Sequence, residues 1–89
     1  MDGKGFIGNI EENLVPISPI ISFAIKKQLA EIGTTVEDLN PKEAMCFIDN
    51  MTDALELFLG KTEASKKRKL MLSLLRKYAP EYFEERSLI

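Results

Sequence analysis

The sequence predicts a small all-α protein: an up-and-down bundle of three main helices with short helical pieces at both ends. Apolar residues recur at spacings of three and four along most of the chain, which is the period of an amphipathic helix. Residues that favour helix caps separate these stretches, and no stretch alternates with the period of two that indicates a strand. At 89 residues the chain can form one core, so we expect a single domain over residues 1–89.

The first main helix is expected over residues 18–32. Ser18 is a favourable N-cap, Pro19 suits the first helical position, and Gly33 suits the left-handed position after the helix. The first half of this helix is apolar on nearly every side, so it needs cover on every side. Before it we expect a mobile tail over residues 1–5 and a short helical piece.

The second main helix is expected over residues 41–59. Asn40 can accept a hydrogen bond at the N-cap, and Pro41 suits the first turn. Glu43 can reach back to the cap amide, which completes a capping box. Gly60 then ends the helix.

The third main helix is expected over residues 63–79, with Thr62 as its N-cap. Pro80 interrupts it, and a short helical piece follows. Thr35 is expected to cap a single turn between the first two main helices. The predicted core comprises the apolar positions that face inward on these helices: Ile21, Ala24, Ile25, Leu29, Ile32, Leu39, Ile48, Met51, Leu55, Phe58, Met71, Leu74, Leu75 and Tyr78.

Enzyme chemistry finds little support in the composition. There is no histidine, so the single cysteine, Cys46, has no histidine to activate it and no second cysteine to pair with. Residues Gly3–Gly8 match G-x-G-x-x-G but have no preceding strand, and Gly60–Thr62 resembles the end of a phosphate-binding loop without its glycines. We therefore expect no catalytic site, no cofactor and no metal.

The location expected for the chain is the cytoplasm, without a membrane anchor. The longest run of low charge, residues 13–25, is too short to cross a bilayer and contains two prolines. A single cysteine is also typical of a reducing compartment.

Charge is distributed unevenly along the chain. Residues 61–77 carry seven cations and one acid, a net charge of +6, while the remaining residues carry 5 cations and 13 acids, a net charge of −8. Four of the cations line one side of the third helix and are the predicted partner-binding residues: Lys66, Lys69, Arg76 and Lys77. We name this set the basic face.

Three interpretations of the basic face remain open. The first is structural, in which these cations pair with the acidic side of the 41–59 helix. The second is contact with an acidic protein partner. The third is contact with nucleic-acid phosphates, although no aromatic or amide side chain lies on the stripe to contact bases.

Surplus apolar residues indicate a second surface. Ile17, Ile20 and Phe23 exceed what one small core needs, so the 18–25 region is expected to form a homodimer or to dock on a protein partner. The sequence thus predicts a protein–protein interaction or regulatory module that self-associates through this region. It is also expected to contact an acidic partner through the basic face. The alternative is a nucleic-acid-binding protein that uses the basic face.

Overall fold

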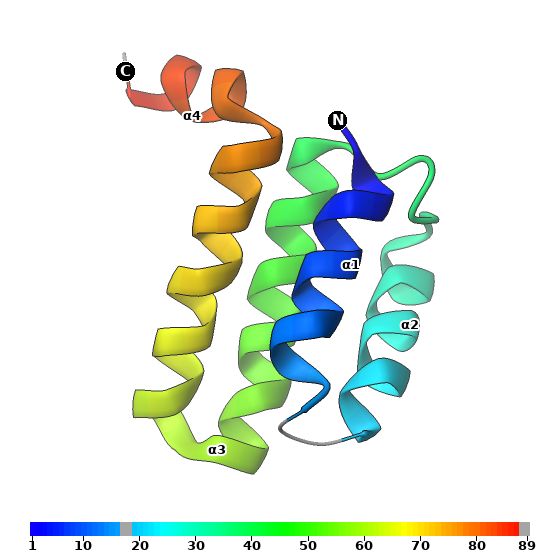
Figure 1. Ribbon diagram of the computed structural model, residues 1–89, viewed down its shortest axis with the longest axis vertical. Helices are drawn as coiled ribbons and strands as arrows, with labels where there is room; N and C mark the ends of the chain where they lie inside the picture. Colours follow the sequence, from blue (N-terminus) through cyan, green and yellow to red (C-terminus); the bar gives the residue numbers. More distant parts are fainter. Residues whose placement is uncertain (17–18, 88–89) are drawn as a thin grey trace.

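The helices of the bundle account for most of the chain. The computed structural model describes residues 1–16 and 19–87, with side chains up to residue 83. These residues form α1 (Gly3–Leu14), α2 (Ile20–Ile32), α3 (Pro41–Tyr78) and α4 (Pro80–Ser87), and no strand occurs among them. Figure 1 shows α1, α2 and the two halves of α3 side by side, with α4 at the end of the bundle where the chain finishes. The predicted all-α bundle is confirmed.

Helix α3 bends at Gly60, whose φ of 80° and ψ of 170° are not helical. We call residues 41–59 the first arm and residues 61–78 the second arm. Glycine suits this position because it adopts positive φ without a steric penalty. The expected N-cap at Thr62 is wrong, since one residue suffices for the turn and the second arm is already helical at Lys61.

The capping box at the start of α3 is confirmed. The Glu43 amide donates to Asn40 Oδ1 at 2.8 Å, and the Asn40 amide donates to Glu43 Oε1 at 3.1 Å. Gly33 ends α2 in the left-handed region, with φ at 83°, as expected. Helix α2 begins at Ile20 rather than at residue 18, with helical dihedral angles at Pro19. The predicted cap Ser18 lies outside the described residues.

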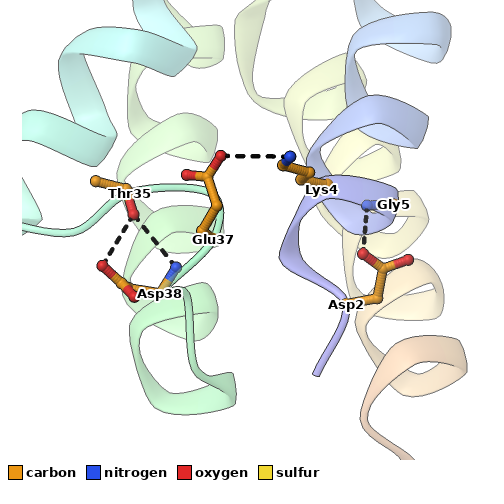
Figure 2. Close-up of polar contacts among 6 residues, drawn as sticks. All are labelled: Asp2, Lys4, Gly5, Thr35, Glu37 and Asp38. Atoms are coloured by element: carbon orange, nitrogen blue, oxygen red, sulfur yellow. Dashed lines mark hydrogen bonds and ion pairs between the residues drawn. The ribbon is translucent and has the colours of Figure 1, made fainter.

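Helix α1 differs most from the sequence-based expectation. Residues 1–5 were expected as a tail, but Gly3 already belongs to the helix and is buried. Figure 2 shows how this end is fixed: Asp2 Oδ1 accepts a hydrogen bond from the Gly5 amide at 3.0 Å. Lys4 forms an ion pair of 3.6 Å with Glu37, in the loop before α3.

That loop contains the single turn expected from the sequence. Thr35 Oγ1 accepts a hydrogen bond from the Asp38 amide at 3.3 Å and donates one to Asp38 Oδ2 at 3.1 Å. Gly3 packs directly on this loop, because a Cβ at that position would collide with the carbonyl oxygen of Val36. The loop and the start of α1 therefore form one close contact.

The core lies between α1 and the other helices. Phe6 of α1 is fully buried and meets Phe47 and Tyr78 edge to face, with ring centroids 6.5 Å and 6.3 Å away. Helix α1 also contributes Ile7, Ile10 and Leu14 to the core. None of these four was in the predicted core.

Most of the predicted core is buried, with one clear exception. Phe58 is 60% exposed, so its assignment to the core is wrong. Helix α1 contributes four large apolar side chains that fill the interior, and Phe58 is left at the surface. Four further predicted core residues are only half-buried against the cluster: Ala24, Ile32, Leu74 and Tyr78.

Within the described part of the chain, no helix combines the length and the apolar character that crossing a membrane requires.

Candidate functional site

A groove lies between α2 and the first arm of α3, and we name it the apolar groove. Its volume is about 270 Å³, and buried core side chains lie beneath it. Its rims are formed by Ile20, Phe23, Ala24 and Lys27 from α2 and by Ala54 and Phe58 from α3. Most of these side chains are apolar, which is typical of a docking surface rather than of a solvated helix face.

The groove exists because α2 and the first arm of α3, which run antiparallel, do not cover each other completely at one end. Helix α2 begins at the end of the bundle where α3 bends, as Figure 1 shows. Ile21 and Ile25 of α2 face the core, which turns Phe23 away from it. Phe23 is 73% exposed and Phe58 is 60% exposed, one on each side of the groove.

The apolar surface continues beyond the groove along α3. Leu57 is 87% exposed and neighbours Phe58 on the helix side that faces away from the core. Asp53 lies one turn before Leu57 on the same side and is exposed. Neither Lys27 nor Asp53 forms an ion pair with a residue whose side chain the structure describes.

One groove-lining residue, Gln28, has a buried polar atom without a hydrogen-bond partner in the described part of the chain. The Oε1 atom of Gln28 is buried, and no donor among the described residues reaches it. A buried acceptor without a hydrogen bond destabilises the folded state.

The sequence-predicted docking residues fall on this groove in part. Ile20 and Phe23 line it, and Ile20 is 49% exposed. Ile17 lies outside the described residues. Phe58 was missed as a surface residue because it continues the apolar stripe of Met51 and Leu55. The structure shows that this stripe is wider than the part of it that the other helices cover.

The basic face lies on the second arm of α3, at the opposite side of the bundle from α2 in Figure 1. All four predicted residues are exposed. Lys66 and Lys69 line one shallow hollow of about 440 Å³ with Thr62 and Ser65. Lys69 and Arg76 line a second of about 350 Å³ that also contacts Phe83.

Contacts within the protein already engage part of the basic face. Lys66 Nζ lies 3.2 Å from Glu63 Oε1, one turn earlier on the same arm. The Arg76 guanidinium carbon lies 5.1 Å from the centre of the Phe83 ring, within the range of a cation–π contact. Lys77 Nζ lies 6.0 Å from the Tyr78 ring and lines neither hollow. Lys69 thus lines both hollows, whereas Lys66 lines only the first and Arg76 only the second.

The structural interpretation, in which cations pair with the acidic side of the 41–59 helix, holds for Arg68, which lies outside the basic face. Arg68 Nη2 lies 2.9 Å from Asp49 Oδ1, which joins the second arm of α3 to the acidic side of the first arm. Arg68 is about two-thirds buried, and its Nη1 has no hydrogen-bond partner among the described residues. Among the described side chains, no other cation of residues 61–77 forms an ion pair with the first arm.

The remaining chemistry of the surface is sparse. Cys46 is an exposed free thiol. No cluster of three or more metal-ligating side chains occurs in the described part of the chain. Comparison with known proteins found no family model, no curated protein and no solved structure that matches this chain.

Proposed function

We propose that this chain is a helical protein–protein interaction module and that the apolar groove is its docking surface. The observation that carries the proposal is the exposure of Phe23 and Phe58 on the two sides of one groove. Aromatic rings that flank an apolar depression are the usual anchors of protein interfaces. Burial of the exposed parts of both rings would contribute roughly 5–7 kcal/mol.

That contribution has to exceed the cost of association, about 4–15 kcal/mol of lost motional freedom. Two rings are therefore too few for a stable complex on their own. Ile20 and Leu57 extend the apolar surface on either side, at 49% and 87% exposure. With these neighbours the surface reaches the scale of a small interface.

The basic face is a second contact surface in this proposal, and its partner is an acidic protein segment. Its support is the row of Lys66, Lys69 and Arg76 along two hollows, with Phe83 at one of them. Cations beside an aromatic ring and serine hydroxyls suit a carboxylate-rich segment that carries an apolar residue.

Cross-linking and affinity capture from native lysate test the proposal with two matched variants. Phe23→Ser with Phe58→Ser disrupts the groove, and Lys66→Glu with Lys69→Glu disrupts the basic face. Because the two surfaces lie on opposite sides of the bundle, each variant controls for unfolding in the other. We expect each variant to lose a different set of captured or cross-linked proteins. Cross-links between copies of the chain should be among the losses. Identical capture by all three proteins would contradict the proposal.

Nucleic acid remains the alternative partner for the basic face. Phosphate contacts would make binding weaken steeply with salt, with a slope set by the number of cations engaged. Binding to duplex and single-stranded DNA and RNA at about 50 mM salt, where phosphate contacts are strong, tests this directly. No binding at that salt rules out the alternative. Binding that Lys66→Glu with Lys69→Glu abolishes would favour it over an acidic protein.

A further inference from the structure

The apolar groove is about two helical turns long. Its lining runs from Ile20 to Gln28 on α2 and from Met51 to Phe58 on the first arm of α3. At a rise of about 1.5 Å per residue, each stretch spans roughly 10–12 Å. Because α2 lies beside the first arm, these stretches form two walls of nearly equal length. A molecule bound along the groove therefore contacts the protein over about two turns of helix.

Groups that can hydrogen-bond are scarce in the groove. Among its lining side chains, only Lys27 and Gln28 carry a nitrogen or oxygen atom. The helices on both sides use their backbone N–H and C=O groups internally, apart from their first and last turns. An extended segment would therefore bury backbone groups without partners, at about 1–3 kcal/mol for each group. An α-helix satisfies its own backbone groups, so the groove favours a helix as its occupant.

An α-helix also matches the groove in length. Residues i, i+3 or i+4, and i+7 lie on one side of a helix and span about 10 Å. One end of such a row would lie beside Ile20 and Phe58, where α3 bends. The middle position would lie between Phe23 and Ala54. Both surroundings are apolar, so these two positions of the bound helix require large apolar residues.

Charge is confined to the other end of the groove. Among the residues that line it, only Lys27 is charged, and it lies about 10 Å along α2 from Ile20. Lys27 is exposed, and no described side chain forms an ion pair with it. Glu31, one turn further along α2, is also exposed but does not line the groove. A carboxylate at the third position of the row would therefore meet a cation, and such a pair fixes the register of the bound helix.

We propose that the apolar groove receives an amphipathic α-helix of another protein, an inference that rests on the docking function proposed above. The bound helix has two large apolar residues, three or four positions apart, which contact the groove between Ile20 and Ala54. An aspartate or glutamate one turn beyond them pairs with Lys27. The rings of Phe23 and Phe58 pack against the two flanks of the bound helix.

Selection from two peptide display libraries tests the inference, with the full chain as bait. One library is an alanine-rich helix of about 20 residues, long enough to form in water, with its surface positions randomised. The other is an unstructured library of equal length. We expect the helical library to yield binders that share the apolar spacing and an acid one turn away. Phe23→Ser with Phe58→Ser in the bait should weaken a selected peptide about hundredfold or more, measured by fluorescence anisotropy.

Charge reversal at two neighbouring lysines isolates the ion pair. Lys27→Glu and Lys26→Glu change the net charge equally, and both lysines are exposed, but Lys26 does not line the groove. We expect Lys27→Glu to weaken the selected peptide about fivefold and Lys26→Glu to change its affinity by less than about twofold. A peptide whose acid is replaced by lysine should bind the Lys27→Glu chain more tightly than the original peptide does. Circular dichroism spectra identical to those of the unmodified chain establish that each variant is folded.

Three results would overturn the inference. The first is a helical library that yields no binder dependent on Phe23 and Phe58. The second is an unstructured library that yields tighter binders without the helical spacing. The third is an equal effect of Lys27→Glu and Lys26→Glu, which would exclude the ion pair.

The two proposals fail in different ways. Lysate capture that needs Phe23 and Phe58, together with binders that lack the helical spacing, retains the docking function but excludes a helix as the occupant. Lysate capture and peptide binding that are both insensitive to these two rings exclude both proposals. A dimer of this chain that depends on both rings and that no selected helix displaces would show that a second copy occupies the groove instead.

Discussion

A pair of matched glycine substitutions in α1 tests how closely the start of the chain is packed. A Cβ at Gly3 would collide with the carbonyl oxygen of Val36 and lie 3.1 Å from the Cβ of Leu39. The main obstacle is backbone, so the loop or the helix has to move, at about 1–3 kcal/mol for overpacking of this kind. A Cβ at Gly8 would have no atom within 4 Å. Alanine there gains roughly 0.5–1 kcal/mol because glycine is unfavourable inside a helix.

The two variants contain the same chemical change, so composition and charge cancel in the comparison. For a domain of this size each kcal/mol shifts Tm by roughly 4–8 °C. We expect Gly3→Ala to lower Tm by roughly 5–20 °C and Gly8→Ala to raise it by roughly 2–8 °C. Thermal unfolding followed by circular dichroism measures both, and urea unfolding provides the free energies. Equal shifts, or a Gly3→Ala variant that is more stable, would refute the close contact between α1 and the loop.

Two other predictions concern burial and charge. Phe47→Ala should lower the free energy of unfolding by about 3–5 kcal/mol because the ring is fully buried. Phe58→Ala should change the free energy of unfolding of the monomer by no more than about 0.5 kcal/mol because its ring is exposed. Urea unfolding at low protein concentration compares them, and similar losses would contradict the two assignments. The pKa of Glu37 lies below its usual value, chiefly because a backbone amide hydrogen-bonds its carboxylate and also because Lys4 is close. The resulting small stabilisation is present above the pKa of the unfolded chain and is lost as the pH falls through the lowered value. In an NMR titration, Lys4→Met should raise the pKa of Glu37, and an unchanged midpoint would exclude the ion pair.

Local signals in the sequence predicted the later helices well. The capping box from Asn40 to Glu43 and the left-handed Gly33 depend only on residues a few positions apart, so the sequence contains all the information that they need. The end of the helix at Gly60 was predicted, but the way in which the next helix begins was not. A threonine after a glycine suggests an N-cap, whereas the positive φ of the glycine alone completes the turn.

The length of α1 was underestimated because two of its glycines pack against distant parts of the chain. Gly3 and Gly5 suggest a mobile tail when only local propensity is considered. In the structure a side chain at Gly3 would collide with a loop more than thirty residues later, and one at Gly5 would collide with Asp2 and Tyr78. No local pattern contains this information.

The candidate site shows the same division between local and tertiary information. Ile20 and Phe23 were predicted as surface residues because α2 is apolar on too many sides for one core. Phe58 was placed in the core because it belongs to an apolar stripe. The stripe alone does not show how much of it the neighbouring helices cover.

The central proposal is that the apolar groove is a docking surface for protein, at which copies of this chain also associate. A dilution series of amide NMR spectra on the isotope-labelled chain tests it residue by residue. We predict concentration-dependent shifts over residues 20–28 of α2 and residues 50–58 of α3, and constant shifts along the second arm of α3. Spectra that do not change with concentration, or changes confined to the basic face, would contradict the claim.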